Sequence, residues 1–161
     1  MPAKNRIIDN KKFSYSGPID FQKFYKSLKE YWDSKGFDFL ETKHDEKVKE
    51  DGSRSISLEW HIEKKVTDYV TYSYDISISL DNLKVLEGGR QYAENLSITI
   101  NGDLITDYAK YFGDKPFNIF LRGLFESYIF GSEIGEHKKN LSKIGDGFLD
   151  LAKDLTASFR L

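Results

Sequence analysis

The stretch Asp114–Gly131, read as DKPFNIFLRGLFESYIFG, is the most apolar helical pattern in the chain. Pro116 suits the first turn of a helix, and Gly131 suits the left-handed residue that ends one. The large apolar residues recur at helical spacing: Phe117, Phe120, Leu121, Leu124, Phe125, Tyr128 and Ile129. A helix this apolar must be covered from more than one side. We therefore expect it to form the core, and Leu124→Asp to abolish cooperative unfolding.

We expect the surfaces that cover this helix to come from segments in which apolar and polar residues alternate, as they do in β-strands. The clearest alternation spans residues 69–81, where every second residue is polar. Its other positions are all apolar: Val70, Tyr72, Tyr74, Ile76, Ile78 and Leu80. One buried face and one solvated face are typical of an antiparallel sheet.

Two further strands are predicted over 37–49 and 54–66, joined by a loop centred on Gly52. A three-residue loop pairs Val48 with Ile56 and His44 with Trp60. One face of the pair is then apolar: Leu40, Val48, Ile56, Leu58, Trp60 and Ile62. We prefer this register because a slip of one residue turns the apolar set to the wrong side.

The remaining elements follow from capping, turn and periodicity signals. They are a flexible N-terminal tail over 1–11, a short strand around Phe13, a helix over 21–35 with Asp20 as N-cap, a loop over 82–93, and a hairpin turning at Asn101-Gly102. An apolar seam from Ile134 to Leu155 predicts a C-terminal helix. The glycines at Gly145-Asp146-Gly147 leave open whether residues 133–160 form one helix or two.

These elements predict a single α+β domain over residues 1–161. An antiparallel sheet of about five to six strands carries one N-terminal helix and two C-terminal helices on its apolar face. The element order is loosely similar to that of helix-grip domains, in which a curved sheet wraps a long C-terminal helix around a ligand cavity. This is a resemblance of element order alone.

Composition excludes several classes of protein. The chain has no cysteine, which excludes a disulfide framework, a thiolate metal site and a cysteine nucleophile. It holds no signal-like N-terminus and no run of about 18 apolar residues, so we expect a cytoplasmic protein without membrane contact. Residues 1–36 carry 8 Lys/Arg against 4 Asp/Glu. This excess is too mild to predict nucleic-acid binding.

The most site-like polar cluster is Glu59, His61 and Glu63, which alternation places on one face of a strand. Two carboxylates flanking an imidazole suit metal binding or acid–base chemistry. The preferred register sets Lys43 opposite His61, which disfavours a cation, and a solvated sheet face explains the cluster equally well. We therefore predict no metal site here.

His44, Trp60, Tyr72 and Tyr74 share the apolar face of the predicted sheet and carry polar tips. Side chains of this kind can line a cavity that holds a small molecule. They are the candidate ligand-binding residues. His137 lies on the seam of the C-terminal helix, where a hydrogen-bonded core histidine is the expected role.

Motifs of nucleotide-binding, metalloprotease and serine-hydrolase sites are absent from the sequence. No cofactor and no catalytic residue are therefore assigned, and the sequence leans away from an enzyme. Three functions stay open. The first is a module that binds a small apolar ligand between the sheet and the C-terminal helices. The second is a protein-interaction or assembly module, as a homodimer or partner adaptor, and the third is an enzyme that uses Glu59 and His61, or His44.

Overall fold

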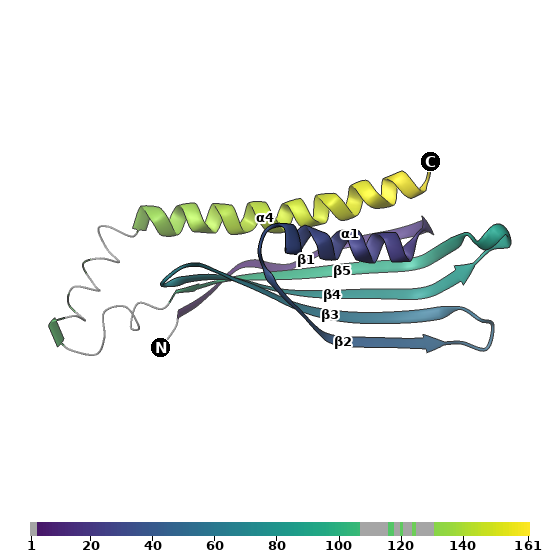
Figure 1. Ribbon diagram of the computed structural model, residues 1–161, viewed down its shortest axis with the longest axis horizontal. Helices are drawn as coiled ribbons and strands as arrows, with labels where there is room; N and C mark the ends of the chain where they lie inside the picture. The colour runs from purple at the N-terminus through teal and green to yellow at the C-terminus, as the bar shows by residue number, and fades with distance from the viewer. Residues whose placement is uncertain (1–2, 107–115, 118–119, 121–123, 125–130) are drawn as a thin grey trace.

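The computed structural model describes residues 3–106, 116–117, 120, 124 and 131–161 (Figure 1). The elements in this part of the chain are, in order, β1 (Ala3–Ile19), α1 (Phe21–Ser34), β2 (Asp38–Val48), β3 (Arg54–Thr67), β4 (Val70–Val85), the short 3-10 helix η1 (Glu87–Gly89), β5 (Gln91–Thr106) and α4 (Gly131–Phe159). The strands form one antiparallel sheet of order β1-β5-β4-β3-β2. The predicted α+β class and antiparallel sheet are confirmed.

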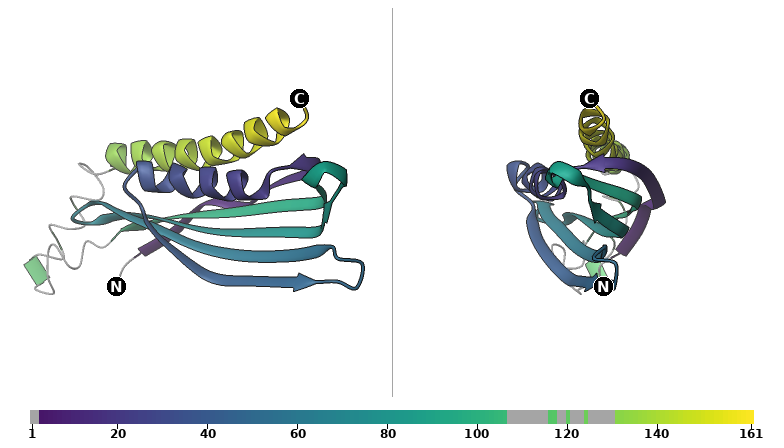
Figure 2. Two further views of the ribbon diagram at one scale, coloured as in Figure 1. Left: turned by 45° about the vertical axis from the view of Figure 1, so that its right-hand side comes forward. Right: turned by 90° about the vertical axis from the view of Figure 1, so that its right-hand side faces the viewer.

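The sheet is strongly curved, and both helices lie on its concave side (Figures 1 and 2). Helix α1 connects one edge strand, β1, to the other, β2, and so crosses this face. Helix α4 runs along β1 and β5 and also packs on α1. The concave face is therefore covered by two helices that come from opposite ends of the chain.

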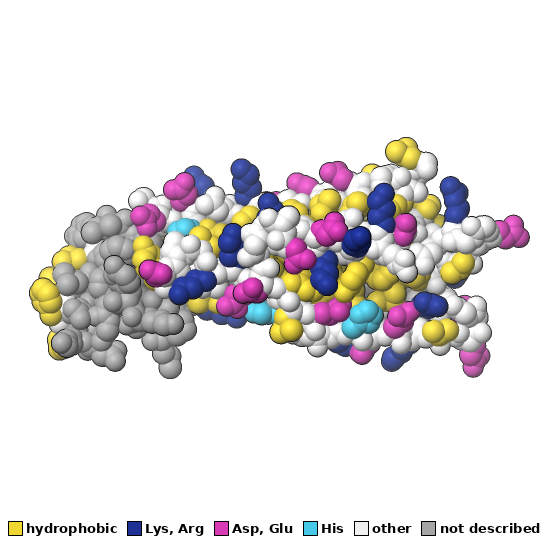
Figure 3. All heavy atoms as spheres, viewed as in Figure 1, with side chains coloured by type: hydrophobic (Ala, Val, Ile, Leu, Met, Phe, Trp, Pro, Cys, Tyr) yellow, Lys and Arg dark blue, Asp and Glu magenta, His cyan; other side chains and the backbone are white. Residues whose placement is uncertain are grey.

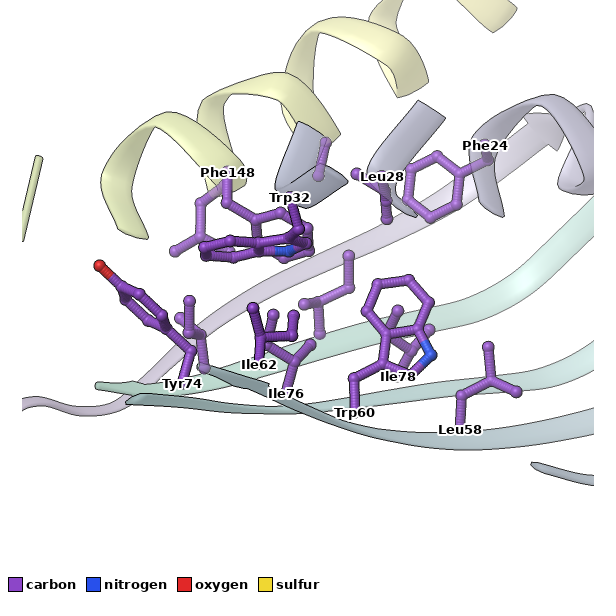
Figure 4. Packing of buried hydrophobic residues seen from close by; sticks show 14 of the residues in the cluster. Phe24, Leu28, Trp32, Leu58, Trp60, Ile62, Tyr74, Ile76, Ile78 and Phe148 are labelled. Carbon is purple, nitrogen blue, oxygen red and sulfur yellow. The ribbon is translucent and has the colours of Figure 1, made fainter. Parts of the chain in front are cut away.

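The core between the sheet and the helices is rich in aromatic rings (Figure 4). Trp32 of α1 is fully buried, and its ring centroid lies 5.3 Å from that of Phe148 on α4 and 4.8 Å from that of Tyr74 on β4. Figure 4 shows Trp32 and Phe148 above the sheet side chains Tyr74 and Ile62. Each such side chain contributes roughly 1.5–3 kcal/mol on burial.

Helix α1 forms as its sequence predicts. The Asp20 carboxylate accepts a hydrogen bond from the backbone N–H of Lys23 at 3.2 Å, which caps the first turn. Its buried stripe is Phe24, Leu28 and Trp32. Gly36 follows the helix with a φ of +78°, the left-handed conformation that ends helices.

Helix α4 is one continuous helix, which settles the question that its glycines left open. A Cβ on Gly145 would overlap Cδ1 of Ile8 on β1, and a Cβ on Gly147 would lie 2.6 Å from the hydroxyl oxygen of Tyr31 on α1. These glycines therefore let α4 approach β1 and α1 closely instead of breaking the helix.

The hairpin predicted at Asn101-Gly102 is wrong. Strand β5 runs without a turn through both residues, and Gly102 pairs with Ile8 on one side and Tyr74 on the other. A Cβ on Gly102 would lie 2.9 Å from Cδ2 of Leu141 on α4. The glycine marks a close approach of the helix to the strand and not a turn. Because β5 is uninterrupted, the sheet of the described residues has five strands and not six.

The register predicted for β2 and β3 is also wrong. The observed pairs are Val48 with Arg54 and His44 with Leu58, two residues away from the predicted ones. A bulge between Glu41 and Lys43 then reverses the alternation of β2, so that Leu40 pairs with His61. Leu40 is consequently exposed on the outer face, and Val48, opposite Arg54 at the end of this edge strand, is exposed as well.

Residues 3–11, expected as a flexible tail, form the first half of β1 and pair with the end of β5. Only Ile8 is buried among them, and the pairing is interrupted on both sides of Ile8, so the sequence carries no clear alternation. The loop expected over 82–93 is much shorter, because β4 reaches Val85 and β5 begins at Gln91.

Most of Asp114–Gly131, including the first of the two predicted C-terminal helices, lies outside the described residues. Three of its apolar side chains are described, and they are exposed: Phe117 at 68%, Phe120 at 62% and Leu124 at 40%. The prediction that these three belong to the core is wrong. The core of the described residues is built instead by the sheet, α1 and α4.

Candidate functional site

The four predicted ligand-binding residues face the concave side but do not gather around one space. Trp60 and Tyr74 are almost fully buried, and Trp60 packs against the rings of Tyr25 and Phe39. The Tyr74 hydroxyl donates to the backbone carbonyl of Leu141 at 2.8 Å. His44 is exposed on the edge strand, and Tyr72 alone lines a pocket.

Glu41 is a concave-face residue that the sequence analysis missed. Its carboxylate accepts hydrogen bonds from Nε1 of Trp60 and from the hydroxyl of Tyr25, each at 3.2 Å, and lies 3.4 Å from Nδ1 of His44. Burial and the nearby Glu41 charge raise the pKa of Tyr25, which keeps its hydroxyl a neutral donor. These partners are all side chains of the folded core and its edge. The role of Glu41 is therefore to accept the hydrogen bond of the Trp60 indole N–H and to hold β2 against α1.

The predicted cluster of Glu59, His61 and Glu63 lies on the sheet face away from the helices. Nδ1 of His61 is 2.8 Å from Asp75 on β4, and Nε2 is 3.0 Å from Glu63. Glu59 pairs with Ser77 instead. The hydrogen bond to Asp75, followed by that to Glu63, raises the pKa of His61 above its ordinary value.

This outer cluster has the geometry of an ion-pair network. The carboxylates of Asp75 and Glu63 contact different ring nitrogens of His61. They therefore do not converge with one nitrogen on a single point. Within the described residues no group of three or more His, Asp or Glu side chains has the arrangement of a metal site.

A pocket of about 340 Å³ opens where α1 ends, between the β3–β4 strand pair and α4. We call it the lysine pocket. Its lining residues are Lys35, Phe37, Lys64, Val66, Tyr72, Asn140, Lys143 and Ile144. Three separate segments of the chain meet here: the connection from α1 to β2, the β3–β4 strand pair, and one face of α4.

The local sequence explains how each segment reaches the lysine pocket. Lys64 is the next inward position of β3 after Ile62 and pairs with Tyr72 of β4. Phe37 is buried directly after the turn that ends α1. On α4, residues 140, 143 and 144 share one helix face because they are three and four residues apart. The floor of the pocket is therefore apolar and its rim basic.

The lysines of this rim have no acidic partner among the described residues. Nζ of Lys64 donates to the backbone carbonyl of Lys35 at 2.7 Å and lies 5.6 Å from the ring centroid of Phe37. Nζ of Lys35 lies 4.9 Å from the ring centroid of Tyr31. In the part of the chain that the structure describes, Lys35, Lys64 and Lys143 form no salt bridge. Their positive charges therefore add in one place.

Tyr72 forms the polar part of the floor. Its hydroxyl lies 2.7 Å from Nδ1 of His137, and Asn140 lines the same pocket. Burial raises the pKa of Tyr72, so the hydroxyl stays neutral. His137 has the expected role of a half-buried, hydrogen-bonded histidine on the seam of α4.

Two other hollows fit a small ligand less well. The first has a volume of about 830 Å³ and borders both flanks of α4. It includes Tyr31 on one flank and, on the other, Asp146, which pairs with Lys11. The second, of about 490 Å³, contains both Asp20 and Arg90 and lies at the opposite end of the molecule. Figure 3 shows acidic and basic side chains mixed over the visible face. The lysine pocket differs from these surroundings because its charged lining residues are all basic.

No helix in the described ranges is both long and apolar enough to cross a membrane. Comparisons of the chain with protein-family models, with curated proteins and with solved structures find no match.

Proposed function

We propose that this protein is a non-catalytic binding module that holds a small, largely apolar ligand between the sheet and α4, in the lysine pocket. The observation that carries the proposal is the pocket itself, where the buried side chains of Phe37 and Tyr72 meet Ile144 of α4. Its volume of about 340 Å³ falls at the lower end of the range of roughly 300–1,000 Å³ that is usual for small-molecule sites.

The chemistry of the lining favours binding over catalysis. Tyr72 and His137 are the nearest approach to an acid–base pair, and burial makes the Tyr72 hydroxyl a weaker acid than in water. The described lining contains no carboxylate and no serine or threonine hydroxyl that could act as base or nucleophile. Apolar side chains with a few fixed donors suit recognition of a ligand.

The test is a titration with N-phenylnaphthylamine, a neutral apolar dye whose fluorescence rises in an apolar site. We expect saturable binding to the wild type. Val66 is 37% exposed at the pocket wall, so Val66→Trp should fold and should fill the pocket. Val85→Trp is the matched control, because Val85 is 68% exposed at the far end of β4.

Loss of dye binding in Val66→Trp and its retention in Val85→Trp would support the proposal. Absence of saturable binding to the wild type, or equal binding by both variants, would overturn it.

Assembly into a homodimer is the second candidate, and a separate observation favours it. Phe117, Phe120 and Leu124 are exposed at spacings of three and four residues, which is the pattern of an apolar helix face. Sedimentation velocity of the wild type and of a Phe117→Ser/Phe120→Ser variant tests this. A dimer that forms with rising concentration and is lost in the variant is expected, whereas a wild type that stays monomeric at high micromolar concentration would exclude it.

A further inference from the structure

We infer that the ligand of the lysine pocket is an amphipathic anion, with a carboxylate or phosphate head group on an apolar body. This inference rests on the proposed function and names the class of ligand. It follows from the position of the lysines, from the absence of acidic partners for them in the described part of the chain, and from the apolar floor beneath them.

Lys64 occupies a position where the fold otherwise places apolar side chains. The inward residues of β3 are Ile56, Leu58, Trp60 and Ile62, all buried, and Lys64 continues the series. The stem of Lys64 follows this apolar series, and its ammonium lies at the exposed rim of the pocket. One of the three N–H donors of the Lys64 ammonium donates to the Lys35 carbonyl. The carbonyl groups at the C-terminal end of α1 also favour a cation there.

That contact explains Lys64 but neither Lys143 nor the ammonium of Lys35. These lysines come from α4 and from the end of α1, and both border the same space as Lys64. Cations that repel one another at one pocket destabilise the fold slightly, and an anion between them removes the repulsion.

Some basic side chains of the described residues are matched by a carboxylate, whereas many exposed lysines form no salt bridge there. Lys84 meets Glu94 at 2.7 Å, Arg54 meets Glu46 at 3.1 Å, and Arg6 meets the buried Asp103 at 2.9 Å. Each of these pairs satisfies its charge within the fold. The lysine pocket differs from the rest of the surface because three such unmatched lysines border one space above an apolar floor, so an anionic partner fits there.

The hollow along α4 extends this positive region. It shares Lys35, Lys143 and Ile144 with the lysine pocket and adds Lys138 and Lys139. Of its two acidic side chains, Asp146 is paired with Lys11 and Asp150 forms no salt bridge within the described residues, so four lysines outnumber one unpaired carboxylate. The apolar end of the combined surface is at Phe37 and Tyr72. The head group of a ligand would therefore lie among the lysines, with its apolar body toward these two rings.

The experiment compares three probes of the same chain length by isothermal titration calorimetry below their micelle concentrations: decanoate, decyl phosphate and decanol. We expect at least one anion to bind about tenfold or more tightly than decanol, which corresponds to one close charge interaction of about 1.4 kcal/mol. The anion's affinity should also fall as salt is raised. Preference for decanoate or for decyl phosphate identifies the head group, and either preference supports the inference.

Lys143→Gln is the decisive variant, because Lys143 is exposed and its removal leaves the core intact. It should weaken anion binding about fivefold or more and leave decanol binding unchanged. Lys153→Gln, at another exposed site of α4, is the matched control and should change neither. Decanol binding as tightly as the anions, or no effect of Lys143→Gln, overturns the inference and leaves the proposed function standing. Binding of none of the three probes overturns both.

Discussion

Cδ1 of Ile8 on β1 fills the space that a side chain on Gly145 of α4 would need. Ile8 also packs against Gly102 of β5, where a Cβ would lie 3.2 Å from the same methyl group. One buried isoleucine is thus held between two glycines, one on the sheet and one on the helix. This contact sets how closely α4 approaches the concave face.

Gly145→Ala is therefore expected to lower the free energy of unfolding by about 1–3 kcal/mol, the usual cost of an overpacked core. Urea denaturation followed by tryptophan fluorescence measures the change. Gly135→Ala is the matched control, because a Cβ there meets no atom within 4 Å. It should raise stability by up to about 1 kcal/mol, the difference in helix propensity between the two residues.

A double-mutant cycle identifies the atom that causes the cost of Gly145→Ala. Valine lacks Cδ1, so in an Ile8→Val background the cost of Gly145→Ala should shrink to near zero or change sign. An undiminished cost in that background would show that the Ile8 contact does not limit the approach of the helix.

Two tyrosine hydroxyls, one from β4 and one from α1, donate hydrogen bonds to backbone carbonyls of α4. Tyr74 donates to the Leu141 carbonyl at 2.8 Å and Tyr31 to the Ile144 carbonyl at 2.6 Å. Burial raises the pKa of Tyr31 to about 12, so its hydroxyl remains a donor across the ordinary pH range. Tyr74→Phe should cost about 1 kcal/mol of unfolding free energy, the net value of one internal hydrogen bond.

Tyr31→Phe should cost less, because Tyr31 is only half-buried. Tyr92→Phe serves as the control, since its hydroxyl makes no hydrogen bond within the described part of the chain. A Tyr74→Phe variant as stable as Tyr92→Phe would refute the importance of the bond to α4. Urea denaturation of the three variants makes the comparison.

His61 should make stability depend on pH. Its hydrogen bonds to Asp75 and Glu63 raise its pKa in the folded protein, so folding favours the protonated ring. The resulting stabilisation is fully present below the unfolded-state pKa of about 6.5 and is lost as pH rises through the higher folded-state pKa. The difference in unfolding free energy between the wild type and His61→Gln should therefore decrease across that window.

An NMR titration of the His61 ring measures the pKa directly. Asp75→Asn removes the largest cause of the shift, so it should lower the ring pKa and flatten the pH dependence of stability. A ring that titrates at or below the ordinary histidine value in the wild type would contradict this account of the outer cluster.

The sequence predicts the parts of this fold that depend on local periodicity. The inward series of β4 from Val70 to Leu80 and the stripe of α1 ending at Trp32 are buried as expected. A repeated apolar spacing reports which side of an element faces the core. Two signals of the lysine pocket were available in the sequence: Tyr72 on the apolar face of β4, and the inward position of Lys64 in the alternation after Ile62.

The remaining features depend on packing between distant segments. The bulge in β2 brings Glu41 under Trp60, and nothing in the local sequence marks it. Gly102 resembles a turn residue in the sequence and serves a close helix contact in the structure. Lys35 and Lys143 meet Lys64 only because α1 and α4 end up beside each other on one face of the sheet. Periodicity shows that a face is buried, but it does not show what covers it.

Leu28 and Leu124 test where the core lies. Leu28 is fully buried on α1, whereas Leu124 is 40% exposed. Leu28→Asp places an unpaired carboxylate in the core, so it should cost roughly 4 kcal/mol or more and abolish cooperative unfolding. Leu124→Asp should change the free energy of unfolding by no more than about 1 kcal/mol, in contrast to what its helical pattern predicts. Circular dichroism during urea titration distinguishes the two outcomes, and a Leu124→Asp variant that loses its cooperative transition would return Leu124 to the core.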